Sequence, residues 1–186
     1  MPTTKSEKLR ADSARVRAQM LDAARARLRD GDLELPMNAI AKAAGVGVGT
    51  VYRHFPTRQV LLESLAEQSF ESLVADARAA TADPDVAAGV ARLLGAGLEI
   101  LLTDPSLAAV LSGPGPECAQ TTELSQELFA SLTTLLDRAH AEGVIRPDVT
   151  ADDLRRLMCG LQHAVRIGGD DSAGRYLEVV LRGLRA

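Results

Sequence analysis

Residues 47–58 gather, within one short stretch, side chains that could bind a polyanion. Among the side chains with hydroxyl groups or nitrogen donors are Thr50, Tyr52, Arg53, His54 and Arg58. The stretch opens on Gly47-Val48-Gly49, in which two residues without side-chain bulk would let the backbone approach a ligand closely. Val48 adds an apolar group of the kind that contacts a thymine methyl. Donors for phosphate oxygens and base edges beside an open backbone predict a contact with DNA.

The elements that must position these donors are short. Apolar spacing predicts one helix over 36–44, with Met37, Ile40 and Ala41, and a second over 48–55 after a glycine-containing turn. Helices of about two turns are marginal alone, so this pair must pack on its neighbours.

The neighbouring helices are predicted at 13–29 and 58–80. Val51 and Phe55, four residues apart, would anchor the second short helix to them. A short helix presented by such a unit is typical of a helix-turn-helix that enters the major groove. A purely structural helical hairpin, with glycines that allow close packing, is the alternative.

The charge distribution favours the first interpretation. Residues 1–60 carry 11 Lys/Arg and 6 Asp/Glu, whereas the remaining 126 residues carry 10 and 19. The first third is therefore basic and the rest acidic. This division indicates a small module that faces a polyanion, attached to a body that does not.

The rest of the chain has the signature of an all-α protein with about nine helices. Apolar residues make up 46% and aromatic residues 3%, and no stretch has the alternation of a strand. Asp83-Pro84 and Asp104-Pro105 each join a capping acid to a proline, a signal for a helix start. Thr150 with Asp153 resembles a capping box. Residues 1–12 lack periodicity and are expected to form a flexible basic arm.

Membrane and export functions are not expected. No apolar run reaches the roughly 18 residues of a spanning helix, and the first 16 residues lack the apolar run of a signal peptide. The sequence predicts a cytoplasmic protein.

Catalysis is the weakest of the functional alternatives. Its candidates would be His140 or His163 with nearby acids, or Cys118 as a nucleophile, but no triad spacing, metal-ligand cluster or phosphate-binding glycine loop accompanies them. Cys118 and Cys159 are interpreted as small, semi-buried apolar residues. We expect no enzyme activity, no metal and no cofactor.

The run IAKAAGVGVGTVYRHFPTRQVLL, together with the helix that precedes it, resembles the tetracycline-repressor (TetR) family of bacterial regulators over about residues 15–65. The resemblance implies a homodimer on a palindromic operator, with repression relieved by a small ligand. It places Asn38, Gly47, Val48, Gly49, Thr50, Tyr52, Arg53 and His54 at DNA-contacting positions and Arg58 at the phosphate-clamp position. Pro36 departs from the family pattern, which usually has a capping Thr or Ser there.

The expected organisation is an arm at 1–12, a DNA-binding domain at 13–60 and a regulatory and dimerisation domain at 61–186. Gly95 and Gly97, in mid-helix, allow either close helix packing or room for a ligand. The walls of a pocket for a small, largely apolar ligand would then come from Phe70, Leu94, Leu98, Leu102, Val110 and Phe129.

The last two helices lie where the family forms its dimer interface. The expected interface residues are Leu154, Leu157, Met158, Leu161, Val165, Leu177, Val180, Leu181 and Leu184. The sequence thus predicts a DNA-binding transcriptional regulator, with operator DNA, a second copy and a ligand as partners and no membrane. A helical adaptor that keeps the fold without operator binding is the alternative.

Overall fold

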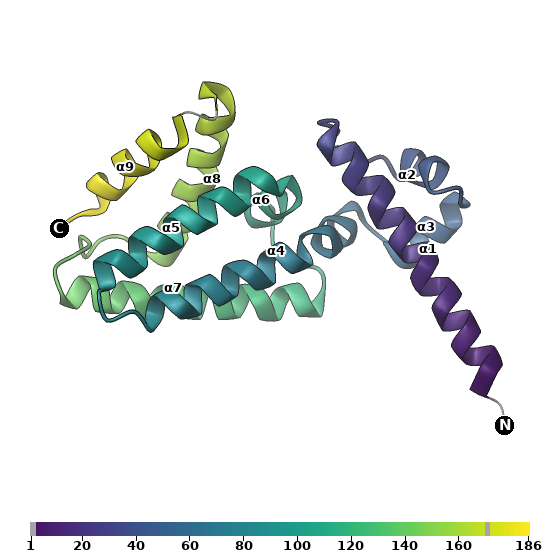
Figure 1. The fold of residues 1–186 in the computed structure, drawn as a ribbon, viewed down its shortest axis with the longest axis horizontal. Helices are drawn as coiled ribbons and strands as arrows, with labels where there is room; N and C mark the ends of the chain where they lie inside the picture. Colours follow the sequence, from purple (N-terminus) through teal and green to yellow (C-terminus); the bar gives the residue numbers. More distant parts are fainter. Residues whose placement is uncertain (1–2, 170–171) are drawn as a thin grey trace. The chain divides into compact units, whose positions relative to one another are not determined.

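The computed structural model describes residues 3–169 and 172–186, and within them it contains nine helices (Figure 1). Their bounds are α1 Thr3–Arg29, α2 Met37–Ala43, α3 Val48–His54, α4 Arg58–Thr81, α5 Val86–Thr103, α6 Pro105–Ser112, α7 Ala119–Ala141, α8 Ala151–Gly168 and α9 Ala173–Leu184. The only β-structure in this part of the chain is a single antiparallel bridge between Ile145 and Arg185. The predicted all-α fold is confirmed.

The chain divides into two compact units, the first ending at Leu65 and the second beginning at Ala66. The division falls inside α4, so that one continuous helix belongs to both units. In the first unit, α2 packs against both α1 and α3.

The arm expected at residues 1–12 is helical from Thr3 onward, as the N-terminal part of α1. Residues 7–15 are exposed, and the first fully buried residue of α1 is Met20. Extending an existing helix costs little, because each added residue gains one backbone hydrogen bond without a new nucleation step. The packed part of α1 can therefore support a solvated extension that has no apolar periodicity of its own.

Side-chain caps define most of the predicted helix starts. Asp104 caps α6 and Pro105 follows at its first position, and Thr150 forms a complete capping box with Asp153 at the start of α8. At α5 the expectation was wrong by two residues. Asp85 is the cap there, accepting from the backbone N–H of Ala88, because Asp83 instead accepts from the backbone N–H of Asp85.

The second unit is built around α5, which contacts α6, α7, α8 and α9 (Figure 1). By length and composition α5 could cross a membrane, but eight of its residues are buried, among them Leu93, Leu94 and Leu98. We therefore interpret α5 as the core helix of this unit. Within this unit, hydrogen bonds also join α7 to α4, including one of 2.7 Å from Arg138 Nη1 to the carbonyl of Thr81.

The capping box of α8 supplies a first prediction. Thr150→Ala removes the side chain that accepts from the backbone N–H of Asp153 and donates to its carboxylate, so the free energy of unfolding should fall by about 1 kcal/mol. Thermal unfolding followed by circular dichroism measures the change. The control is Thr133→Ala, at an exposed position inside α7, which should not destabilise the protein. Equal destabilisation by the two variants would contradict the assigned role of the cap.

Candidate nucleic-acid interface and ligand pocket

The turn between α2 and α3 depends on Gly45, which adopts a left-handed conformation with φ +66°. The N–H of Val46 donates to the carbonyl of Ala41 at 3.0 Å, and the N–H of Gly45 donates to that of Lys42 at 3.3 Å. This pair of bonds is the Schellman arrangement that ends a helix and satisfies its last carbonyls. The chain therefore leaves α2 sharply and enters α3 after only four residues.

α3 has one fully buried face and one exposed face. Val51 in α3 and Phe55, the residue directly after this helix, are both 0% exposed. Val48 is 42% exposed and Tyr52 is 50% exposed. Of the other predicted contact residues, five are exposed (Asn38, Gly47, Gly49, Arg53 and Arg58) and two are half-buried (Thr50 and His54). A Cβ added to Gly49 would meet nothing within 4 Å. The start of α3 is therefore open to an approaching molecule.

Arg17 of α1 fixes the end of α3 within the first unit. Its guanidinium lies over the ring of Phe55, 5.3 Å from the centroid, and its Nη2 donates to the hydroxyl of Ser64 at 3.0 Å. One arginine thus joins α1, the residue after α3 and α4 through a cation–π contact and a hydrogen bond. This role of Arg17 could not be predicted from the sequence, since arginine spacing alone does not show which aromatic ring lies beside it.

The loop before α2 shows how this helix begins without the capping Thr or Ser expected at position 36. Pro36 occupies the N-cap position without a side-chain cap, and Leu35 before it has φ +48° and is 1% exposed. A left-handed leucine costs roughly 1–2 kcal/mol, which burial of its side chain offsets. Asp32 stabilises this geometry by accepting from the N–H of Leu35 at 3.3 Å.

The carboxylate of Asp32 is itself held by Arg27, whose Nε donates to it at 2.8 Å. The hydrogen bond from Arg27 lowers the pKa of Asp32 below its ordinary value. The ionised carboxylate therefore favours the folded loop at neutral pH, and this contribution is lost as the pH falls through the lowered pKa.

Arg58 also closes this loop. Its guanidinium donates to the carbonyl of Glu34 at 3.0 Å and to that of Leu33. The side chain expected to clamp a phosphate therefore positions the entry to α2 in this structure. Arg53 by contrast makes no hydrogen bond or ion pair with the described residues, which leaves its donors available.

A pocket with about 460 Å³ of empty space, its open mouth included, lies within the second unit. Its walls come from α4, α5, α7 and α8 and from Leu111 near the end of α6: Leu73, Leu93, Leu94, Gly97, Leu101, Leu111, Leu128, Leu132, Leu154, Arg155, Met158 and Cys159. Gly97 forms part of the wall, and a Cβ there would lie 3.5 Å from Leu73, an ordinary contact. Gly97 is therefore not required by close helix packing.

Of the six predicted pocket residues, only Leu94 lines this pocket. Phe70, Leu98 and Val110 are buried elsewhere in the second unit, and Leu102 and Phe129 are half-buried. Helical periodicity identified residues that face inward, but it does not distinguish filled core from cavity wall.

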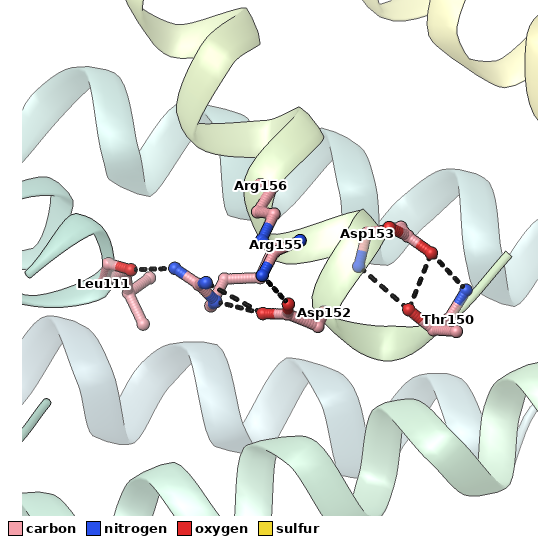
Figure 2. A network of polar contacts seen from close by, with 6 residues as sticks. All are labelled: Leu111, Thr150, Asp152, Asp153, Arg155 and Arg156. Atoms are coloured by element: carbon pink, nitrogen blue, oxygen red, sulfur yellow. Dashed lines mark hydrogen bonds and ion pairs between the residues drawn. The ribbon is translucent and has the colours of Figure 1, made fainter. Parts of the chain in front are cut away.

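A polar network lies where α8 begins (Figure 2), and one of its members, Arg155, lines the pocket. Arg155 Nη1 donates to the carbonyl of Leu111 at 2.5 Å, and its Nε and Nη2 donate to Asp152 at 2.9 and 2.8 Å. Arg156 pairs with the other oxygen of the same carboxylate at 2.7 Å. Arg155 thereby ties the last turn of α6 to the first turns of α8. Arg155 was not among the residues predicted for the site, although it directly follows Leu154 in the sequence.

The residues expected at the dimer interface divide into two groups. Five are buried within the unit itself: Leu154, Met158, Leu161, Val165 and Leu184. Leu177, Val180 and Leu181 are half-buried, and Leu157 is 43% exposed. The apolar side chains that the two helices leave most open are instead Ile167, 76% exposed, and Val179, 64% exposed.

The residues considered for catalysis lie at different places along the chain: Cys118 precedes α7, His140 lies in the last turn of α7 and His163 lies in α8. His163 is exposed and His140 is half-buried, and the buried Nε2 of His140 has no hydrogen-bond partner among the described residues. Within residues 3–169 and 172–186, no group of three His, Cys, Asp or Glu side chains is placed to hold a metal ion.

Two family models match the chain. Residues 20–65, which hold α2, α3 and the start of α4, match the model of bacterial regulatory proteins of the tetR family. Residues 98–186 match the C-terminal domain of SbtR-like transcriptional regulators. The chain belongs to the TetR family. It is therefore a DNA-binding transcriptional regulator, and its helix-turn-helix is the part that the first model matches.

Solved structures of TetR regulators are similar along nearly the whole chain. One from Streptomyces coelicolor is 29% identical, covers 91% of this chain and 98% of its own, and has a TM-score of 0.54. One from Mycobacterium vanbaalenii is 31% identical over 96% and 99%, with a TM-score of 0.47. A putative regulator from Shewanella sp. PV-4, 16% identical over 92% and 98%, shares the fold with a TM-score of 0.62. No curated protein matches the chain in sequence.

The different surroundings of Arg58 and Arg53 yield the second prediction. Arg58→Ala should lower the free energy of unfolding by about 1 kcal/mol, because the carbonyls of Leu33 and Glu34 lose a charged donor, and should also weaken DNA binding. Arg53→Ala, the control, should leave the melting temperature unchanged but reduce the salt dependence of DNA binding by about one phosphate contact. Thermal melts and fluorescence anisotropy at several salt concentrations measure both effects. Unchanged stability of Arg58→Ala would show that this arginine does not support the loop.

Proposed function

We propose that this TetR-family regulator is a homodimeric repressor that binds a palindromic operator and leaves it when a small, largely apolar ligand occupies the second unit. The observation that carries the proposal is the contrast between the buried face and the exposed face of α3. Val51 and Phe55 are fully enclosed, while Val48 and Tyr52 project outward at 42% and 50% exposure. The exposed face thus brings an apolar and an aromatic side chain together beside an open glycine backbone, which a partner can approach closely.

The exposed face suits the major groove in its chemistry. Val48 offers an apolar contact for a thymine methyl, and Tyr52 and Thr50 offer hydroxyls. Arg53, which makes no hydrogen bond or ion pair within the described part of the chain, offers donors for a phosphate oxygen. For Asn38, which is exposed in α2, we propose a contact with the DNA backbone beside the groove.

Homodimerisation is supported by the apolar side chains left open on α8 and α9. Ile167, Val179 and Leu157 are among the most exposed large apolar residues in the described chain. Burying them against the same surface of a second copy would remove them from water. A two-fold dimer also explains a palindromic operator, because each half-site then receives one α3.

Ligand response is supported by the pocket and by the continuity of α4. Leu73 of α4 lines the pocket, and α4 begins at Arg58, the residue that holds the loop before α2. A ligand that displaces Leu73 would thus act on a helix shared with the DNA-binding unit. Since its target is chromosomal DNA, we propose that the protein acts in the cytoplasm and without catalysis.

Operator binding is the third prediction. Tyr52→Ala should raise the dissociation constant for DNA from upstream of the protein's own gene by about tenfold or more, as expected when one base-edge contact of roughly 1–3 kcal/mol is lost. Fluorescence anisotropy with labelled duplexes measures this change. Leu33→Ala, which removes a 43% exposed side chain from the same unit outside α3, should bind like the parent. Equal affinities of Tyr52→Ala and the parent would overturn the assignment of α3 as the reading helix.

The fourth prediction concerns the dimer. Ile167→Glu should weaken self-association by about thirtyfold or more, because a charge would be buried where an apolar contact of roughly 2 kcal/mol is lost. Light scattering over a range of protein concentrations should show a shift toward the mass of one chain. Leu9→Glu, at a 64% exposed position in α1, is the matched control. A dimer as stable as that of the parent would exclude this face as the interface.

A further inference from the structure

The pocket in the second unit is lined almost entirely by hydrocarbon. Leucine side chains supply most of its wall, and neither an aromatic ring nor an acidic group is present among its lining residues in the described chain. Such a surface favours a flexible aliphatic body over a planar aromatic one, because it offers dispersion contacts and no ring to stack on. A cationic ligand would find no carboxylate to pair with in this wall and would remain desolvated at high cost.

Arg155 is the exception in this wall. It is the one charged side chain among the described lining residues, and because the exposed wall is almost wholly apolar, Arg155 lines it with the hydrocarbon part of its side chain. In all, 24% of this side chain is exposed. Its guanidinium is turned toward α6, where Nη1 donates to the carbonyl of Leu111 (Figure 2). That acceptor is neutral, so an anion entering the pocket could replace it with a stronger, charge-assisted partner.

The carboxylate that pairs with Arg155, that of Asp152, also pairs with a second arginine. Asp152 accepts from Arg155 through Oδ1 and from Arg156 through Oδ2. The neighbouring Asp153 is engaged with the backbone N–H and the hydroxyl of Thr150. The partners of Arg155 are therefore a carboxylate that also pairs with Arg156 and a neutral carbonyl. The guanidinium can still bind a further anion.

We propose that the pocket takes an aliphatic monocarboxylate and that Arg155 binds its carboxylate in place of the Leu111 carbonyl. This inference rests on the proposed ligand response and names the class of ligand and the residue that selects it. Exchange of the partner of Arg155 would release the last turn of α6 from α8. The aliphatic chain would lie against the leucine wall, including Leu73 of α4.

Decanoate is a suitable probe, because its unbranched hydrocarbon chain matches the leucine-rich wall of the pocket. Decanoate and 1-decanol share the same chain and differ in the charge of the head group.

The fifth prediction is tested by isothermal titration calorimetry of the full-length protein with decanoate and 1-decanol. The parent should bind decanoate, and Arg155→Gln should weaken that binding by about tenfold to a hundredfold, as expected for loss of a hydrogen bond to a charged group. Binding of 1-decanol should change by less than about threefold, since its hydroxyl does not need the guanidinium. Circular dichroism confirms that each variant is folded.

Two further variants keep the inference falsifiable. Arg156→Gln, whose side chain is 68% exposed and outside the pocket wall, should bind decanoate like the parent. Arg155→Lys keeps the charge and should retain most of the affinity even where Arg155→Gln unfolds. Failure of the parent to bind decanoate, equal losses in Arg155→Gln and Arg156→Gln, or equal losses for decanoate and 1-decanol would each overturn the proposal.

The same titrations distinguish this inference from the proposed function. Decanoate binding that depends on Arg155 but leaves the operator complex intact would support the ligand class and refute the release mechanism. Release of the operator by an uncharged ligand, with no binding of decanoate, would support the release mechanism and refute the ligand class.

Discussion

The burial of Val51 and Phe55 is the interaction on which the rest of the DNA-binding unit depends. α2 and α3 have seven residues each, too few for either to be stable alone. Because Val51 and Phe55 are completely enclosed, α3 is held by one face and its opposite face must point outward. Its orientation therefore follows from packing, and the polar groups on the outer face need no contacts of their own to be positioned.

The same constraint explains the polar contacts around this core. Arg17 covers the ring of Phe55 and reaches Ser64, and Arg58 with Asp32 fixes the loop that leads into α2. These contacts determine where the two short helices begin and end, whereas the apolar core determines that they stay packed. In the second unit the core around α5 is incomplete, because a pocket replaces part of it beside Gly97 and Leu73.

The all-α fold, the helix-turn-helix and the caps at Asp104 and Thr150 could be predicted from the sequence, because each follows from local spacing and cap chemistry. The pocket wall and the open surface of α8 and α9 could not be derived in this way. Periodicity distinguishes inward from outward positions, but Phe70 fills core while Leu73 lines a cavity, and the two have the same pattern. The tie from Arg58 to Leu33 and Glu34 was also hidden, since it joins residues 24 and 25 positions apart.

Hydroxyl-radical footprinting of the full-length protein on DNA from upstream of its own gene tests the central claim most directly. A dimer that places one α3 in each half-site should protect two backbone patches about one helical turn, or roughly 34 Å, apart and related by two-fold symmetry. This result would join the buried anchor of α3, its exposed face and the dimer in one observation. A single protected patch, or uniform protection that does not depend on sequence, would contradict the account.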